Sequence, residues 1–368
     1  MKIAILGTRG IPNFHGGFEQ FAEYFSVHMV EKGHEVYVYN SHSHPYQKKE
    51  FNGVKILHQK DPENKIGTFG QFIYDLNCIR HSRRQNFDII LQLGYTSSSV
   101  WGKLLPKSSV IVTNMDGLEW KRSKYSKPVR KFLKIAEKLA INTSDNLISD
   151  SVGIENYIKE KYGKDSEFIA YGANLFSKPN ESILEEYKLK PYEYNMLIAR
   201  LEPENNIETI LRGVAICEIN KSFIVIGKHN TKYGEYLKTK FKSIEKIKFL
   251  GGIYNQSHLN NLRYYSNSYF HGHSVGGTNP SLLEAMASSS FIIANDNIFN
   301  KSILGNDAFY FKTSKDVAEL LRHNKKEYLD FIKANKTKIE SLYSWRIIND
   351  KYENYLIKCF DELDRSKV

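Results

Sequence analysis

The chain has 368 residues, of which 41% are hydrophobic and 25% are charged, a composition that excludes a disordered protein and predicts two domains with separate cores. The formal net charge of +11 favours an anionic partner, such as a nucleic acid, an acidic membrane surface or a diphosphate, although it also serves simply to keep a protein soluble. Three widely spaced cysteines indicate reduced structural thiols in a cytoplasmic protein rather than a disulfide framework.

Strand-length apolar runs alternate with helix-length amphipathic stretches along the first half of the chain. Residues 2–7 are apolar and lead straight into a glycine-bearing loop, which favours a first strand over a signal peptide. A helical pattern over residues 18–32 and a second strand at residues 34–40 complete a βαβ opening. No apolar run is long enough to span a bilayer. Further strands are predicted at residues 54–59, 88–94, 110–116, 146–150 and 167–171.

The strand pattern restarts after a segment rich in Gly, Asn and Pro at residues 172–180, which is typical of a linker. We therefore predict an α/β fold with two doubly wound domains, residues 1–175 and 176–344, and a last amphipathic helix within residues 345–368. The strands of the second domain are predicted in the segments YNMLIAR, FIVIGK, IKFLGGI, SYFHGH and FIIAND.

The loop after the first strand, residues 7–19, contains the pair Gly16 and Gly17 followed by Glu19. Glycines let backbone amides approach a ligand closely, and the N-terminus of the following helix attracts an anion. A tight turn that needs small residues is the alternative, and the dinucleotide fingerprint GxGxxG is absent. The glycine pair favours a ligand-binding loop.

Arg200 follows the first strand of the second domain. In open α/β sheets ligands bind at the carboxyl ends of strands, and a planar guanidinium suits a diphosphate. The alternative is a surface arginine that pairs with Glu202 or Glu204.

A loop of Gly, Thr, Asn and Pro follows the strand that ends at His271 or His273, and a helix is predicted to begin near Pro280. Free amides at residues 279–282 would bind an anion, and Glu284, in about the first helical turn, would accept two ribose hydroxyls. A capped helix in which Glu284 only favours the helix dipole is the alternative.

Asp116 ends a strand and is expected to face a cleft. After it, a basic run from Lys121 to Lys138 is interleaved with aromatic residues, which is typical of a surface that docks on anionic lipid headgroups. A solvated helix face is the alternative. No Asp-x-Asp pair is present, so no metal is expected, and no nucleic-acid-binding motif accompanies the basic run.

Four segments, HGGFE, NMDGLEWKR, ARLEPENN and HSVGGTNPSLLEAM, together resemble retaining glycosyltransferases of the GT-B fold in family 4, and within it the bacterial rhamnosyltransferase-type branch of capsule and surface-polysaccharide assembly. The resemblance implies two facing Rossmann-like domains, a C-terminal helix that crosses back to the first domain, and no metal or other cofactor. It also implies transfer of a sugar, with retention, from a nucleoside diphosphate donor to a growing, lipid-linked acceptor at the inner face of a membrane.

The resemblance also assigns roles to residues. Gly16 and Gly17 would approach the donor phosphates, and Glu284 would hold the ribose. Asp116 and Arg200 are the candidate catalytic groups, with Arg200 also binding the diphosphate. The remaining donor-binding candidates are Asn206, His273, Gly277, Thr278, Asn279, Pro280 and Ser281.

This chain departs from the family pattern at three places. Asn205 and Asn206 stand where the family has a second basic residue, so Arg9 is a candidate for the unmet phosphate charge. Gly276 replaces a glutamate that contacts sugar hydroxyls, which favours a deoxy sugar, with L-rhamnose from dTDP-rhamnose as the preferred donor. Asp116 replaces a catalytic histidine.

Other functions fit parts of the same pattern. A UDP-sugar-dependent transferase, a phosphorylase of the same fold and a non-catalytic nucleotide-sugar-binding module remain alternatives. The absence of GxGxxG, together with Asn40 rather than an acidic residue at the end of the second strand, disfavours a dehydrogenase.

Overall fold

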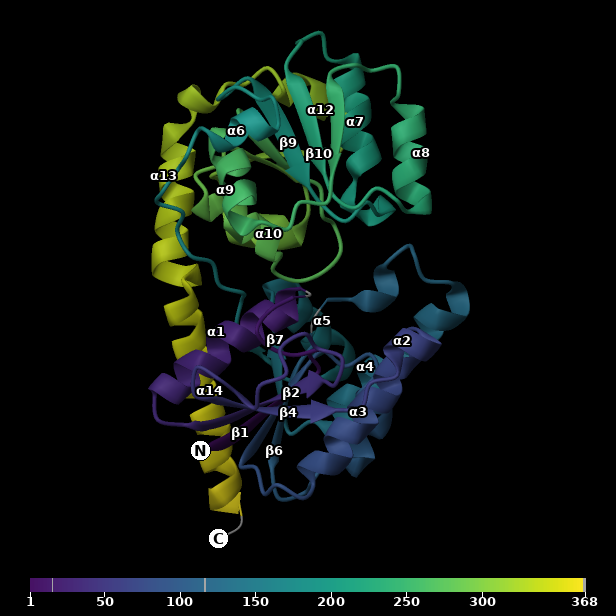
Figure 1. Ribbon diagram of the computed structural model, residues 1–368, viewed down its shortest axis with the longest axis vertical. Coiled ribbons are helices and arrows are strands. Elements are labelled where there is room, and N and C mark those ends of the chain that lie inside the picture. The colour runs from purple at the N-terminus through teal and green to yellow at the C-terminus, as the bar shows by residue number, and fades with distance from the viewer. Residues whose placement is uncertain (15, 116, 367–368) are drawn as a thin grey trace. The chain divides into compact units, whose positions relative to one another are not determined.

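The structure is a computed structural model that describes residues 1–14, 16–115 and 117–366 (Figure 1). The chain divides into two compact units, each built on its own sheet. Unit 1 contains Met1–Trp120, Tyr125–Tyr171 and Trp345–Val368, and unit 2 contains Lys121–Lys124 and Gly172–Ser344. The predicted α/β class with two doubly wound sheets is confirmed.

Unit 1 has an eight-stranded sheet in the order β3-β4-β2-β1-β5-β6-β7-β8, parallel except for the pair β3 and β4. The strand order changes direction between β1 and β5. The strands are β1 (Lys2–Leu6), β2 (Glu35–Ser41), β3 (Glu50–Phe51), β4 (Val54–Gln59), β5 (Ile89–Leu93), β6 (Val110–Asn114), β7 (Asn146–Ser149) and β8 (Glu167–Phe168). The helices are α1 (Gly17–Glu31), α2 (Glu63–Ile66), α3 (Phe69–Ser82), η1 (Ser99–Leu104), η2 (Glu119–Lys121), α4 (Lys127–Thr143), α5 (Val152–Tyr162) and α14 (Trp345–Ser366).

Unit 2 has a six-stranded sheet in the order β11-β10-β9-β12-β13-β14, whose pairings are parallel. Its order changes direction between β9 and β12. The strands are β9 (Tyr194–Ile198), β10 (Ser222–Ile226), β11 (Ile247–Gly251), β12 (Ser268–His271), β13 (Ile292–Asn295) and β14 (Phe309–Phe311). The helical elements are α6 (Ile183–Glu186), η3 (Pro203–Asn205), α7 (Ile207–Ile216), α8 (Lys232–Lys240), α9 (Gln256–Tyr265), α10 (Pro280–Ala287), α11 (Ile298–Leu304), α12 (Ser314–Leu320), η4 (Lys325–Glu327), α13 (Leu329–Lys338) and η5 (Ile339–Tyr343).

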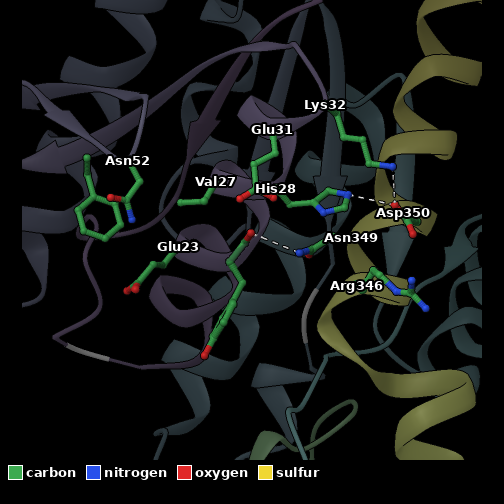
Figure 2. A pocket seen from close by; sticks show the side chains of 11 residues that line it. Glu23, Val27, His28, Glu31, Lys32, Asn52, Arg346, Asn349 and Asp350 are labelled. Carbon is green, nitrogen blue, oxygen red and sulfur yellow. Dashed lines mark hydrogen bonds and ion pairs between the residues drawn. The ribbon is translucent and has the colours of Figure 1, made fainter.

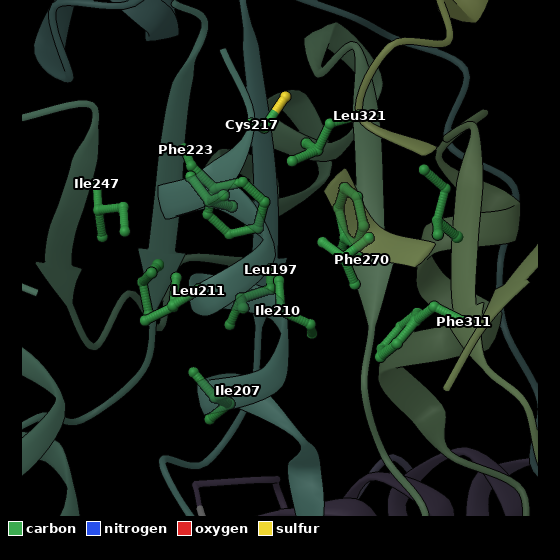
Figure 3. Packing of buried hydrophobic residues seen from close by; sticks show 14 of the residues in the cluster. Leu197, Ile207, Ile210, Leu211, Cys217, Phe223, Ile247, Phe270, Phe311 and Leu321 are labelled. Carbon is green, nitrogen blue, oxygen red and sulfur yellow. The ribbon is translucent and has the colours of Figure 1, made fainter. Parts of the chain in front are cut away.

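One face of the unit 2 sheet packs against α7 in a continuous apolar core (Figure 3). Leu197 of β9, Phe223 of β10 and Phe270 of β12 meet Ile207 and Ile210 of the helix, and all five are buried. Full burial of one such side chain stabilises the fold by roughly 1.5–3 kcal/mol. This core holds the adjacent carboxyl ends of β9 and β12 in place.

The long helix α14 packs against α1 within unit 1 (Figure 2). The ammonium of Lys32 lies 3.0 Å from the carboxylate of Asp350, and the amide of Asn114 donates to the hydroxyl of buried Tyr352 at 2.8 Å. A groove of about 690 Å³ opens beside the pair of Lys32 and Asp350, and none of the predicted site residues lines it. Within the described ranges, no helix is long and apolar enough to cross a membrane. The three cysteines are buried and free.

Candidate active site

Two of the predicted motifs meet at the switch point of unit 2. The loop after β9 carries Arg200 and Asn206, and the loop after β12 leads through Gly276 to α10. The two strands are neighbours, with Leu197 opposite Phe270 in the register. Because ligands bind where the strand order reverses in such sheets, the topology brings both motifs to the expected binding edge.

Hydrogen bonds and a glycine fasten these two loops together. The side-chain amide of Asn206 donates to the carbonyl of Gly272 at 2.8 Å, and the hydroxyl of Ser274 donates to the carbonyl of Glu204 at 2.7 Å. A Cβ on Gly272 would lie 2.1 Å from the carbonyl oxygen of Asn205, so only glycine fits there. Asn206 therefore links the loops, and its amide is already engaged.

Arg200 is exposed beyond the end of β9. Within the part of the chain that the structure describes, its side chain has no hydrogen bond or ion pair. The two glutamates expected as alternative partners are engaged elsewhere. Glu202 lies 3.6 Å from the ammonium of Lys124, and Glu204 accepts a hydrogen bond from Ser123. The guanidinium is therefore available to bind an anion.

The loop before α10 differs from expectation in its free amides. The Asn279 side chain accepts from the amide of Ser281 at 2.9 Å, and its carbonyl accepts from the amide of Leu282 at 3.0 Å. The prediction of free amides is therefore wrong for Ser281 and Leu282, because Asn279 caps the helix. Among the residues described, the amides of Gly276 and Gly277 have no hydrogen bond. Gly276 has φ +127°, and a Cβ there would meet open space.

Glu284 belongs to a buried polar network that the motif alone did not predict. It lies in the second turn of α10, and its Oε2 accepts from Arg263 at 2.7 Å. Arg263 is 1% exposed, packs over the ring of Tyr269 and also donates to the hydroxyl of Ser281 at 3.1 Å. The Ser281 side chain is therefore held inside this network, and Oε1 is the Glu284 oxygen that remains for a ligand. Thr278, at the end of the glycine loop, is buried.

A row of rings leads from this network along one face of β12 and past its end. The ring centroids of Tyr269 and His271 are 6.3 Å apart, and those of His271 and His273 are 4.4 Å apart. Burial lowers the pKa of both imidazoles, that of His273 to about 3, where the positive charges of Arg200 and Arg122 contribute further. Both rings are therefore neutral near pH 7.

Buried polar atoms without a hydrogen-bond partner gather along the same site. Leaving such an atom unsatisfied costs about 1–3 kcal/mol, so a group of them indicates a place that a polar ligand or water fills. In the described part of unit 2, those at the site are His271 Nδ1, His271 Nε2, His273 Nδ1, Arg263 Nε, Glu202 Oε2 and Glu204 Oε1.

The glycine loop of unit 1 is held in a fixed conformation. Gly10 has φ +127°, and a Cβ there would lie 2.3 Å from the side chain of Asn40. That side chain bonds both backbone groups of Ile11, at 3.1 and 2.8 Å. The carboxylate of Glu19 accepts from the amide of Arg9 at 3.0 Å. Glu19 thus organises the loop rather than only favouring the helix dipole.

Gly16 and Gly17 begin α1. Gly16 is the N-cap and is exposed, and a Cβ there would meet only Glu19, at an ordinary 3.6 Å. Packing therefore does not require this glycine.

The Arg9 side chain makes hydrogen bonds of 3.0 and 2.8 Å to Glu63, which raise the pKa of Arg9. Its charge is already balanced, so the structure disfavours Arg9 as the missing phosphate ligand.

The predicted basic run from Lys121 to Lys138 divides between the units. Lys121–Lys124 belongs to unit 2, whereas α4 belongs to unit 1, where Lys134 lies 4.4 Å above the ring of Trp120. Membrane binding by this run stays a prediction. Asp116 lies outside the described residues.

Comparisons with known proteins address the fold. A family model described as a domain of unknown function (DUF1972) matches residues 1–174, and no curated protein matches the sequence. Sucrose-phosphate synthase from Thermosynechococcus elongatus is 15% identical, with a TM-score of 0.81 over 98% of this chain and 99% of that chain. HepE from Anabaena, solved with UDP-glucose, is 14% identical, with a TM-score of 0.77 over 97% and 100%.

A third solved structure agrees with these two. The α,α-trehalose 6-phosphate synthase from Burkholderia multivorans is 11% identical, with a TM-score of 0.75 over 100% of this chain and 98% of that chain. All three are glycosyltransferases of the GT-B type, and at these identities the likeness is one of fold. The chain therefore has the GT-B fold, as its four motifs led us to expect.

Proposed function

We propose that the protein is a glycosyltransferase that takes a sugar from a nucleoside diphosphate donor bound at the switch point of unit 2. The observation that supports this most is the junction of the two loops after β9 and β12. Arg200 and the amides of Gly276 and Gly277 offer an unpaired cation and unpaired donors for the diphosphate. Oε1 of Glu284 would accept from the ribose.

The difficult step is cleavage of the bond between the anomeric carbon and the phosphate. Charge builds on the leaving diphosphate, and Arg200 would stabilise it, an interaction of the kind that is worth about 3 kcal/mol of barrier. We propose that the acceptor hydroxyl attacks from the same face and passes its proton to the departing phosphate, which retains the anomeric configuration. Asp116 would orient the sugar or stabilise positive charge on its ring. No step needs a metal.

For the donor, dTDP-L-rhamnose remains our preferred candidate, since Gly276 offers open space and no carboxylate for sugar hydroxyls. The complexes of HepE with UDP and with UDP-glucose favour a UDP-sugar as the second candidate. The proposed acceptor is a growing, lipid-linked surface polysaccharide.

A thermal-shift panel of nucleoside diphosphates tests the proposal. The correct base should raise the melting temperature, because a ligand at 100 times its Kd stabilises the folded state by about 2.7 kcal/mol. The Arg200→Ala variant should lose this response. Stabilisation by none of the diphosphates would contradict the proposal. Binding without release of the diphosphate in the presence of sugar donor and glycan acceptors would instead favour a non-catalytic module.

We also propose that α4 rests on an anionic membrane surface. Its exposed face combines cations with apolar Ile135, which is 50% exposed. Phe132 extends this face toward Phe72 and the 66% exposed Phe69 of α3, through ring contacts of 5.7 Å. Basic and apolar side chains together are typical of interfacial helices. The exposed lysines of α4 are Lys127, Lys131, Lys134 and Lys138.

A further inference from the structure

The segment Lys121–Lys124 forms part of the candidate site although it is distant in sequence. It belongs to unit 2 by its contacts, and it attaches to the loop that carries Arg200. The hydroxyl of Ser123 donates to Glu204, the second residue of η3. Lys124 and Arg122 lie 3.6 and 4.0 Å from the carboxylate of Glu202. The segment therefore lies beside the proposed diphosphate site.

Arg122 is more deeply set than Lys124, the other cation beside Glu202. Its side chain is 13% exposed, compared with 35% for Lys124. Its charge, like that of Arg200, lowers the pKa of His273. Burial alone would raise the pKa of the Glu204 carboxyl, but the hydrogen bond from Ser123 and the charge of Arg122 hold it below its usual value. Arg122 and Arg200 thus act on the same imidazole.

The donor needs a second cation that the loop after β9 does not supply. The diphosphate of a nucleotide sugar carries two negative charges, and Arg200 balances one. Asn205 donates its side-chain amide to the carbonyl of Arg200 at 2.7 Å, and Asn206 is bonded to Gly272. Arg9 pairs with Glu63 in unit 1. These three side chains are engaged, so none of them is available for the second phosphate charge.

We propose that Arg122 is the second phosphate-binding residue of the donor site and stands in for the basic side chain missing at Asn205 and Asn206. The proposal rests on the proposed function. A guanidinium has five N–H donors, so it can face Glu202 and a phosphate oxygen together. Glu202 then orients the side chain, and Ser123 anchors the segment to Glu204.

Calorimetric binding of the nucleoside, its monophosphate and its diphosphate tests this assignment, with uridine and thymidine as the two bases. Arg122→Ala should weaken diphosphate binding about tenfold or more, the loss expected for a charged hydrogen bond, and leave nucleoside binding unchanged. Arg122→Lys keeps the charge without the fork and should lose less. Lys124→Ala is the matched control, since it removes the other cation beside Glu202, and should change diphosphate affinity less than about twofold.

The outcomes separate the two proposals. Equal losses in Arg122→Ala and Lys124→Ala, or wild-type diphosphate affinity in both Arg122 variants, would overturn the assignment while Arg200→Ala still shows the site to be real. Diphosphate affinity that survives in Arg200→Ala, or no binding by the wild-type protein, would overturn the proposed function as well. Urea unfolding of each variant confirms that the affinities refer to folded protein.

Discussion

The Oε2 atom of Glu284 lies 2.7 Å from a guanidinium nitrogen of Arg263, a side chain that is 1% exposed. The carboxylate proposed to hold the ribose is thus also the partner of a buried cation. Removal of the carboxylate would leave that cation unpaired, so Glu284→Ala would lose binding and stability together and could not separate the two effects. Glu284→Gln, which keeps a hydrogen-bond acceptor for Arg263, is the cleaner functional variant.

Arg263→Met should lower the free energy of unfolding by about 3 kcal/mol, because it leaves the half-buried Glu284 carboxylate without its partner. Urea denaturation measures this. The double variant Arg263→Met/Glu284→Met removes both charges and should recover at least half of the loss. A double variant less stable than the sum of its single changes would contradict the paired network.

Arg200→Ala should reduce turnover by a factor of about 100, which corresponds to about 3 kcal/mol of lost transition-state stabilisation. Its unfolding free energy should change by less than about 0.5 kcal/mol, since the side chain is exposed. Steady-state kinetics and denaturation are measured on the same preparation. Arg212→Ala, at an exposed arginine of α7, is the control and should keep full turnover.

Gly272→Ala should separate the two loops of the donor site. The new methyl group would lie 2.1 Å from the Asn205 carbonyl oxygen, and such overpacking costs about 1–3 kcal/mol. Diphosphate binding should weaken together with stability. Ser274→Ala removes one hydrogen bond to Glu204 without a clash and should cost about 1 kcal/mol. Equal effects of the two changes would contradict the close packing at Gly272.

Lys325 should make stability depend on pH. Its ammonium is buried over the rings of Tyr192 and Tyr264, and burial lowers its pKa to about 7. The unfolded chain then binds more protons between pH 7 and 10.5, so stability rises with pH through that window. Lys325→Met should therefore be more stable than wild type at pH 6, with the difference shrinking toward pH 10. Lys326→Met, at the exposed neighbour, should show no such trend.

Charge reversal on α4 should abolish membrane binding. Each lysine near an anionic surface contributes about 1 kcal/mol, so Lys127→Glu, Lys131→Glu and Lys138→Glu together remove the attraction. Flotation with vesicles containing phosphatidylglycerol at low salt measures it. The matched control reverses three exposed lysines of unit 2: Lys232, Lys315 and Lys333. Failure of the wild-type protein to float would refute the membrane proposal.

Strand positions could be predicted closely because both faces of these sheets are buried and their strands form continuous apolar runs. The strand predicted at residues 54–59 coincides with β4, and the one predicted at 110–116 ends two residues earlier, at Asn114. The last strand of unit 2, Phe309–Phe311, was not predicted, because three residues are too few to show a period.

At the site, the sequence could place Arg200 and the start of α10, since each is fixed by its immediate neighbours. It could not join Ser123 to Glu204, which lie 81 residues apart. Arg263 did leave a signal: it shares the buried stripe of α9 with Leu259 and Leu262. A charged residue on a buried stripe requires a partner of opposite charge, and Glu284 is that partner.

Because Lys121–Lys124 belongs with the second half of the chain, neither unit is a single stretch that could be exchanged with a relative at one boundary. A chimera joined at residue 172 would keep the whole six-stranded sheet of one parent and take this segment from the other. Glu202 and Glu204 would then face foreign partners. A chimera that preserves donor binding therefore has to take residues 121–124 from the same parent as the second half of the chain. Two homologues should tolerate exchange of their halves only where their residues in this segment match.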